Sequence, residues 1–188
     1  IDVCTGTADV ALAAARSPRG AARVLGVDFA SEMLRGGARK IRRGGYAGRI
    51  HLVRGDATRL PVPSESVDGA TVAFGIRNVQ QPERALAEIS RVLRPGGRLA
   101  ILEFSIPRSS IVRACYLPYF RFVLPRVGRL VSGHGTAYAY LPVSVGTFIA
   151  PESMTTLLAA TGFGDVGAVP LTFGIVTLYV ATKPRSEP

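Results

Sequence analysis

The sequence has no tryptophan and only two cysteines, Cys4 and Cys115, which lie far apart. Neither belongs to a C-x-x-C pair or a His-rich stretch, so we expect no metal site, and this usage is typical of the reducing cytosol. No run approaches about 18 uninterrupted apolar residues, which excludes a membrane-spanning helix. A signal peptide is also missing, and the chain opens directly on a strand, so we expect that residues are missing upstream.

The glycine-rich fingerprint of dinucleotide-binding turns, G-x-G-x-x-G, is absent as well. The stretch DVCTGTAD at residues 2–9 runs from a strand end into an Ala-rich helix, but only Gly6 stands where that fingerprint has several glycines. A pyrophosphate requires a bare, positive helix N-terminus, whereas Asp9 occupies the first turn of this one. The turn is therefore either a plain tight turn or a site for a nucleotide-like ligand without a pyrophosphate.

The 188 residues are 47% hydrophobic, which predicts one globular domain over residues 1–188. Up to residue 104 strands and helices alternate, which is typical of a doubly wound α/β sheet with right-handed crossovers. We expect strands at 1–3, 23–29, 50–54, 67–74 and 98–104, and helices at 9–16, 31–41 (capped by Ser31), 82–93 and 151–161. An antiparallel pair at 166–169 and 174–182 closes the sheet, and residues 106–150 form an inserted segment that covers the substrate.

The net charge is +10, and its distribution is uneven. No Asp or Glu occurs between Glu103 and Glu152, and that interval holds many aromatic residues and the arginines Arg108, Arg113, Arg121, Arg126 and Arg129. Basic, aromatic and apolar residues together favour a lipid-facing or apolar-ligand surface over a nucleic-acid groove. A solvated basic surface is the alternative.

Acidic residues follow successive strands. Asp28 ends the second strand, 22 residues after Gly6, where nucleotide folds place the carboxylate that accepts from ribose hydroxyls. Asp56 follows the third strand, where a carboxylate can accept from the adenine amino group while the backbone of Ala57 pairs with the ring edge. Each Asp alone could be a loop cap, but features at neighbouring strand ends favour a nucleoside site.

Several motifs together resemble class I S-adenosylmethionine-dependent methyltransferases, and more narrowly the C-methyltransferase family of menaquinone and ubiquinone biosynthesis. The general part is DVCTGTAD, VDFASEML, GDATRLP and RVLRPGG; the specific parts are FGIRNV (74–79), LEFS (102–105), VLPRVGRLV (123–131) and YAYLPVS (138–144). The resemblance implies a Rossmann-like seven-stranded sheet with an antiparallel last strand. It also implies S-adenosylmethionine as the cofactor, bound by Gly6, Thr7, Asp28, Asp56, Ala57 and Ala73.

Two positions depart from the family pattern. Ala73 stands where some members carry Ser, and Ala8 stands where many have Gly; the family's N-terminal helical segment is also absent here. Electrostatics support the cofactor, because Asp2 and Asp9 near the turn favour a cationic group over a dinucleotide.

For catalysis we expect Arg77 and Asn78, at the end of the fourth strand, to hold a ring oxygen of the acceptor, with Arg77 stabilising a phenolate-like form. A surface ion pair is the alternative for Arg77. Tyr138 and Tyr140 line the ring pocket or merely pack. His134 is a candidate base, or simply a loop residue.

The resemblance thus implies C-methylation of a prenylated quinol, demethylmenaquinol to menaquinol, with the ubiquinone precursor also open. It implies a cytoplasmic protein associated peripherally with the inner membrane surface, with a homodimer left open and no nucleic-acid partner. The alternatives are a methyltransferase for another small apolar phenol, an NAD-binding oxidoreductase, and a non-catalytic binding module.

Overall fold

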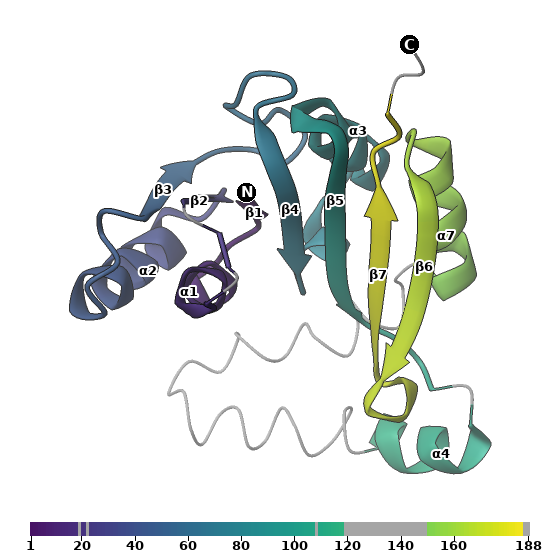
Figure 1. Cartoon of the computed structure of the whole chain (residues 1–188). Coiled ribbons are helices and arrows are strands. Elements are labelled where there is room, and N and C mark those ends of the chain that lie inside the picture. Colours follow the sequence, from purple (N-terminus) through teal and green to yellow (C-terminus); the bar gives the residue numbers. More distant parts are fainter. Residues whose placement is uncertain (19, 22, 108, 119–149, 186–188) are drawn as a thin grey trace.

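A seven-stranded sheet forms the centre of the computed structural model, which describes residues 1–18, 20–21, 23–107, 109–118 and 150–185 (Figure 1). Its order is β3-β2-β1-β4-β5-β7-β6. Neighbours among β1 to β5 pair in parallel, and β7 is antiparallel to both β5 and β6. The strands are β1 (Asp2–Val3), β2 (Val24–Asp28), β3 (Ile50–Arg54), β4 (Val67–Ala73), β5 (Leu93–Phe104), β6 (Gly164–Leu171) and β7 (Val176–Thr182).

Helices cover both faces of this sheet, which confirms the predicted doubly wound α/β fold. Val24 and Val27 of β2 are an odd number of residues apart and so point to opposite faces. Val24 belongs to the apolar cluster of Leu12 and Ile41, and Val27 to the larger cluster that includes Ile89. The helices are α1 (Asp9–Arg16), α2 (Ser31–Arg43), α3 (Pro82–Val92), α4 (Ser110–Pro118) and α7 (Pro151–Ala160), with 3₁₀ turns η1 (Ile76–Asn78) and η3 (Thr172–Gly174).

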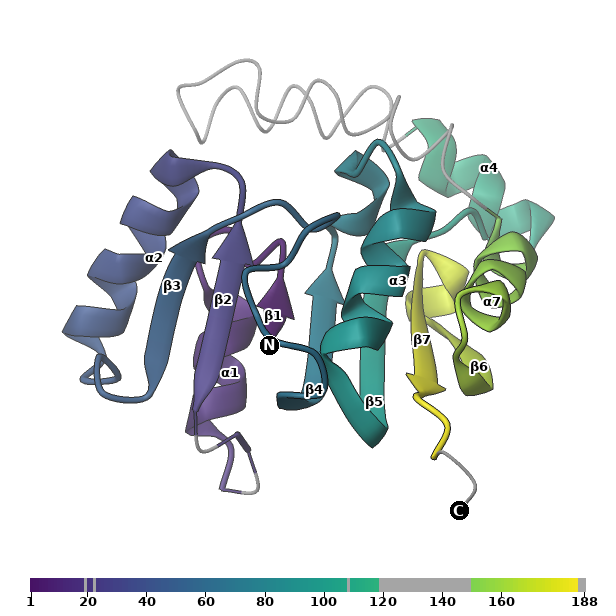
Figure 2. The ribbon, with the colours of Figure 1, turned by 90° about the horizontal axis from the view of Figure 1, so that it is seen from above.

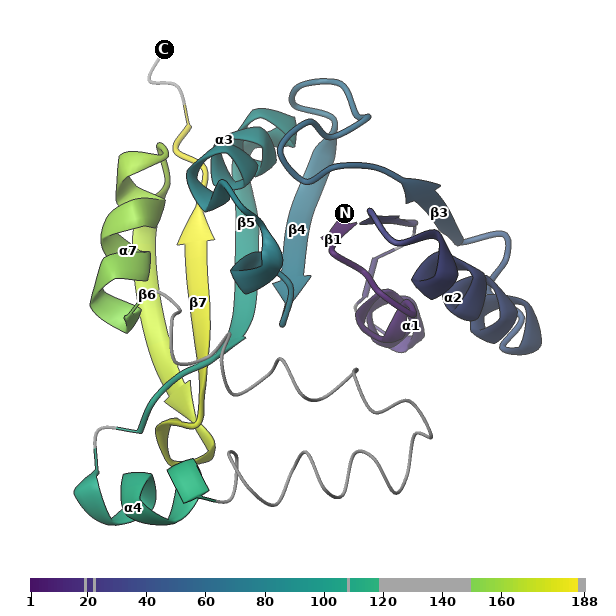
Figure 3. The ribbon, with the colours of Figure 1, turned by 180° about the vertical axis from the view of Figure 1, so that it is seen from behind.

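The helices α3 and α7 lie on one face of the sheet, behind it in Figure 1 and in front of it in Figure 3. The carboxyl ends of β1 to β4 meet at one edge, where the arrowheads point the same way in Figure 2. Residues 119–149, most of the predicted covering segment, lie outside the described residues. None of the helices described here has the length and apolar character needed to cross a membrane.

Two local predictions were wrong. Ser31 does not cap α2: it is the first helical residue, it follows Ala30 in an extended conformation, and no side chain caps this end. The strand predicted at 98–104 begins earlier, at Leu93, so β5 includes the RPGG stretch. Leu93 pairs with Val67 and Arg98 pairs with Gly69, so the extra residues form an irregularity within the strand, with Gly96 at a left-handed φ of 81°.

Candidate active site

The turn between β1 and α1 has an unusual backbone. Cys4, Gly6 and Ala8 all have left-handed φ angles, of 57°, 54° and 64°. A Cβ added at Gly6 would meet no atom within 4 Å, so glycine is needed here for its φ and not because the protein crowds it. The turn therefore presents bare backbone toward open space, where a ligand can approach closely.

Asp28 is tied directly to this turn. Its Oδ2 accepts from the Gly6 N–H at 2.8 Å, and its Oδ1 accepts from the Ala30 N–H at 2.8 Å. Each carboxylate oxygen keeps a second lone pair, so Asp28 can still accept from two vicinal hydroxyls. The structure thus brings Gly6 and Asp28 together, as the sequence predicts for a ribose site.

Asp56 stands two residues beyond β3, in an exposed turn. Its Oδ1 accepts from the Thr58 N–H (2.8 Å) and hydroxyl (2.9 Å), and these bonds hold the pKa of Asp56 below its usual range. Oδ2 has no hydrogen-bond partner among the residues that the structure describes, so it is available to an amino group. Ala57 is 9% exposed and joins the core beside Leu60.

Asp9 and Asp2 do not stand free beside the turn. Lys40 of α2 donates to both Asp9 oxygens (2.9 and 2.8 Å) and to the Thr7 hydroxyl (2.8 Å), and it lowers the pKa of Asp9. Asp2 is 2% exposed and accepts from the hydroxyls of Thr5 and Thr71, while burial raises its pKa. Because Lys40 balances Asp9, the predicted attraction of Asp9 for a cationic ligand is weaker than the sequence suggests.

Arg77 and Glu103 form a buried ion pair at the ends of β4 and β5. Arg77 Nη1 donates to both Glu103 oxygens, at 3.0 and 2.9 Å, and the side chains are 4% and 0% exposed. Burial raises the pKa of Glu103, and the positive charge of Arg77 works in the opposite direction. Arg77 therefore forms an ion pair, which was the alternative for it, but this pair is buried and does not lie at the surface.

A pair of aromatic rings lies beside Arg77. The Phe74 and Phe104 ring centroids are 4.6 Å apart, and the Arg77 guanidinium carbon lies 5.4 Å from the Phe104 centroid. The buried Nε of Arg77 has no hydrogen-bond partner among the described residues, whereas Asn78 at the end of η1 is exposed. Within the described part of the chain, the Nε–H donor thus remains unused at this strand end, next to an exposed amide.

Ala73 is the last residue of β4, and Cys4 packs beneath the turn that follows that strand. A Cβ on Gly75 would lie 2.3 Å from the Cys4 Cβ, so this glycine permits close packing. Burial raises the pKa of the Cys4 thiol to about 12, which makes it a packing residue and not a nucleophile. Tyr138, Tyr140 and His134 lie outside the described residues.

Sequence reasoning missed an apolar rim beside Asp28. Phe29 is 70% exposed and Met33 is 49% exposed, and the Arg54 guanidinium carbon lies 5.4 Å from the Phe29 centroid. The signal was present in VDFASEML, where an aromatic directly follows the strand-end carboxylate. Such a rim can contact the flat face of a base.

Taken together, the carboxyl edge offers bare backbone at Gly6, two unused lone pairs on Asp28, a free oxygen on Asp56 and an apolar rim. These groups fit a nucleoside without a pyrophosphate, which is the nucleoside half of S-adenosylmethionine. Beyond it, the ends of β4 and β5 hold aromatic rings and an exposed amide, which fit an apolar ring with a polar substituent.

Comparison with known proteins agrees with this geometry. Residues 1–183 match the family model described as the ubiE/COQ5 methyltransferase family. The ubiquinone/menaquinone biosynthesis C-methyltransferase UbiE of Geobacter sulfurreducens is 45% identical over 97% of this chain and 71% of that protein. The demethylmenaquinone methyltransferase of Thermus thermophilus is 43% identical over 98% of this chain and 82% of that protein.

The fold is likewise similar to that of solved structures. A SAM-dependent methyltransferase from Aquifex aeolicus superimposes with a TM-score of 0.69 at 18% identity, over 97% of this chain and 80% of that one. At this identity the likeness concerns the fold alone.

Proposed function

The chain belongs to the ubiE/COQ5 methyltransferase family, and we propose on this premise that it transfers the methyl group of S-adenosylmethionine to a ring carbon of a prenylated quinol. The proposed substrate is demethylmenaquinol and the product menaquinol, in line with the names of the relatives from Geobacter and Thermus. The observation that carries the proposal is the Gly6–Asp28 contact at the carboxyl edge of the sheet.

We propose that Asp28 accepts from the ribose hydroxyls, that Asp56 accepts from the adenine amino group and that the Ala57 backbone pairs with the ring edge. Gly6 and Thr7 lie against the remainder of the cofactor, and Ala73 flanks it with no hydroxyl to offer. When bound, S-adenosylmethionine supplies an electrophilic methyl group on a sulfonium. The protein's task is then to orient the acceptor in line with that methyl group and to exclude water.

On the acceptor side, we propose that Asn78 and Arg77 hold a ring oxygen. Asn78 is exposed, and the Nε–H of Arg77 is a donor that no residue in the described ranges accepts. A guanidinium keeps its proton, so Arg77 stabilises negative charge on the oxygen and does not act as a base. Tyr138 and Tyr140 complete the ring pocket in this proposal.

We further propose that the protein works at a membrane surface, where a prenylated substrate resides. The net charge of +10 supports this, since anionic headgroups attract basic proteins. Exposed apolar side chains near the carboxyl end of β5, among them Ile106 (43% exposed) and Phe173 (83% exposed), support it as well.

The proposal is tested by calorimetry with S-adenosylhomocysteine. Asp28→Ala removes acceptors for two hydroxyls and should weaken binding by about 10- to 100-fold. Asp68→Ala removes an exposed carboxylate that pairs with Arg94 and should bind like the unmodified protein. Binding of NAD in place of S-adenosylhomocysteine would contradict the proposal.

Turnover is then measured with labelled S-adenosylmethionine and demethylmenaquinol. Asn78→Ala should lower kcat with little change in the KM for the cofactor, because it removes a contact to the acceptor alone. Methylation of a simple naphthol, with none of demethylmenaquinol, would instead favour another phenolic substrate.

A further inference from the structure

The connection from β3 to β4 crosses the carboxyl edge without a helix. Residues 55–66 carry Asp56 and Ala57, yet of the residues that the structure describes the Asp56 side chain binds only Thr58, in its own turn. The preceding strand, β3, is one of the two edge strands of the described sheet, in which it pairs only with β2. The Gly55 N–H donates to the Asp28 carbonyl at 3.0 Å and ties the start of this loop to β2. The position of the turn that carries Asp56 and Ala57 depends in addition on what holds the rest of the loop.

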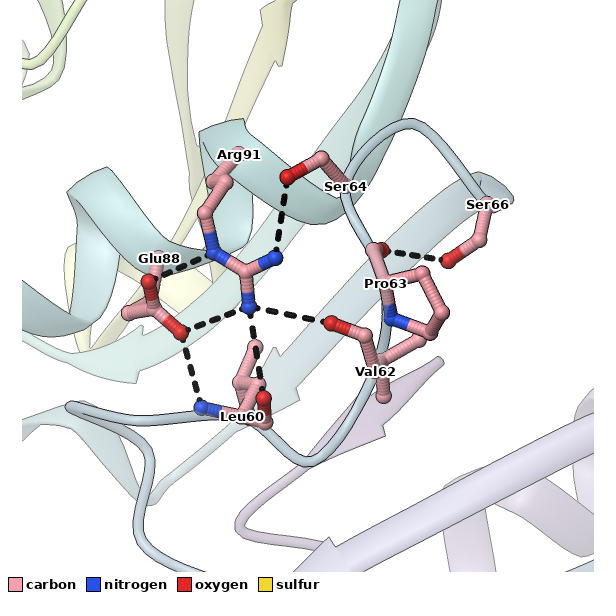
Figure 4. A network of polar contacts seen from close by, with 7 residues as sticks. All are labelled: Leu60, Val62, Pro63, Ser64, Ser66, Glu88 and Arg91. Atoms are coloured by element: carbon pink, nitrogen blue, oxygen red, sulfur yellow. Dashed lines mark hydrogen bonds and ion pairs between the residues drawn. The ribbon is translucent and has the colours of Figure 1, made fainter.

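Two charged side chains of α3 hold it (Figure 4). Glu88 Oε2 accepts from the Leu60 N–H at 2.8 Å. Arg91 Nη2 donates to the Leu60 carbonyl (3.3 Å) and the Val62 carbonyl (3.0 Å), and Nη1 donates to the Ser64 hydroxyl (3.1 Å). The same two side chains bind each other as a fork, with Nε on Oε1 at 2.7 Å and Nη2 on Oε2 at 2.9 Å.

The loop in turn closes the end of α3. The Glu65 N–H donates to the Arg91 carbonyl at 3.0 Å, and the Ser66 N–H donates to the Val92 carbonyl at 2.9 Å. In the contacts of Figure 4, each of the three guanidinium nitrogens of Arg91 has a hydrogen-bond partner. The single ammonium group of a lysine could not donate to all of these acceptors at once. Arg91 holds the pKa of Glu88 below its usual range, so this carboxylate stays charged at neutral pH.

A short, closed turn transmits this anchorage to Asp56. The Arg59 N–H donates to the Asp56 carbonyl at 3.0 Å, and Leu60, the next residue, is the one that Glu88 and Arg91 bind. Leu60 is 3% exposed and shares the core with Ala57. Asp56 and Ala57 are therefore separated from the anchored backbone only by residues whose geometry is fixed.

We propose that Glu88 and Arg91 are positioning residues for the adenine end of the cofactor site, because they fix the loop that presents Asp56 and Ala57. This inference rests on the proposed function, since it assumes that the loop meets adenine. Neither residue touches the cofactor in this account. Their removal should reduce the selectivity of the site for adenine while leaving the Gly6–Asp28 ribose site in place.

The test compares S-adenosylhomocysteine with S-inosylhomocysteine, in which the adenine amino group is replaced by a carbonyl. The unmodified protein should prefer the adenine compound by about tenfold, because Asp56 accepts from the amino group and repels the carbonyl. In Arg91→Ala this ratio should approach one, through weaker binding of the adenine compound. Arg91→Lys keeps the charge without the fork and should lie between the two.

Arg84→Ala is the matched control, because Arg84 lies on the same helix but, within the described ranges, binds only the Gln81 side chain. It should keep the full preference. If Arg91→Ala unfolds, Glu88→Gln gives a second reading, since its amide oxygen can still accept from Leu60 while the charged fork is lost. Urea unfolding of each variant shows that binding is measured on folded protein.

Turnover gives an independent readout, in which Arg91→Ala should raise the KM for S-adenosylmethionine about tenfold and leave kcat nearly unchanged. An unchanged preference for the adenine compound in Arg91→Ala, or an equal loss for both compounds, would overturn the positioning role and leave the proposed function standing. Failure of the unmodified protein to bind either compound would overturn both.

Discussion

The buried pair of Arg77 and Glu103 is a residue-scale feature with a large energetic consequence. Glu103 also accepts from the Phe104 N–H at 2.9 Å, so its charge is compensated from two sides. A buried pair is weak evidence for added stability, but removal of one partner leaves an uncompensated charge. The pair therefore constrains which substitutions the site tolerates, whatever its part in catalysis.

Arg77→Met should lower the free energy of unfolding by about 3 to 5 kcal/mol near pH 8. Without Arg77, burial raises the pKa of Glu103 further above its usual 4.5, so the folded state binds a proton at a pH where the unfolded chain is still ionised. That proton uptake stabilises the folded state as the pH falls. The deficit relative to the unmodified protein should therefore shrink toward about pH 5, as urea unfolding followed by circular dichroism would show.

The double substitution Arg77→Met with Glu103→Gln is the control, because it has no carboxylate to titrate. Its stability difference from the unmodified protein should lack this shrinkage toward low pH. A deficit of Arg77→Met that stays constant from about pH 8 to pH 5 would contradict an ionised, buried Glu103 in this variant.

At the scale of the elements, local sequence patterns located the helices and strands because each pattern is decided within a few residues. The strand at 50–54 and the helix at 9–16 have the predicted bounds. The helix predicted at 31–41 is α2, which ends slightly later, at Arg43. The early start of β5 was not predictable in this way. It depends on the pairing of Leu93 with Val67 of β4, and the end of the RPGG stretch is held by Lys183, whose N–H donates to the Gly97 carbonyl from far along the chain.

The residues of the candidate site also fall into those that a local pattern predicts and those that it does not. The motif residues Gly6, Asp28 and Asp56 stand at strand ends, where the topology of a parallel sheet places them. By contrast, the ion pair of Lys40 with Asp9 joins residues 31 positions apart in the sequence, and that of Arg77 with Glu103 joins residues 26 positions apart. Such pairings depend on which helix lies over which strand end, and no local pattern encodes that.

The contact of α2 with the cofactor turn depends on adjacent glycines that differ in their surroundings. A Cβ at Gly37 would lie 3.1 Å from both the Ala8 Cβ and Leu52 Cδ1, and 3.2 Å from the Thr7 carbonyl carbon. A Cβ at Gly36 would meet only the Thr7 side chain, at 3.2 Å. The two positions are therefore a matched pair for measuring how closely the helix and the turn pack.

Gly37→Ala should destabilise the protein by about 1 kcal/mol, because overpacking of about 1 to 3 kcal/mol exceeds the gain in helix propensity. Gly36→Ala should be neutral or stabilising by up to about 1 kcal/mol, because the flexible Thr7 methyl can move aside. Urea midpoints of the two variants, measured side by side, test this. An equal stabilisation of both would mean that α2 does not pack tightly on the turn.

At the scale of the whole molecule, the carboxyl edge of the sheet combines the site with groups suited to a lipid surface. The helix α4 follows β5 beyond this edge and carries the exposed Arg113 (Figure 2). Arg185 is exposed as well, but it follows β7 at the opposite edge, beside Gly96. If net charge alone draws the protein to membranes, both arginines contribute equally; if the site edge faces the lipid, Arg113 contributes more.

Charge reversal separates these cases, because Arg113→Glu and Arg185→Glu each lower the net charge of +10 by two. With vesicles of phosphatidylcholine and phosphatidylglycerol, we expect Arg113→Glu to weaken co-sedimentation by about tenfold, at about 1 kcal/mol for each charge near the surface. Arg185→Glu should bind almost as well as the unmodified protein. Added salt should weaken all three, because the Debye length falls to about 10 Å at 0.1 M. Equal losses in the two variants would show that the molecule binds membranes by overall charge and without a preferred face. Strong binding to vesicles of phosphatidylcholine alone would show that apolar insertion, and not electrostatic attraction, drives membrane binding.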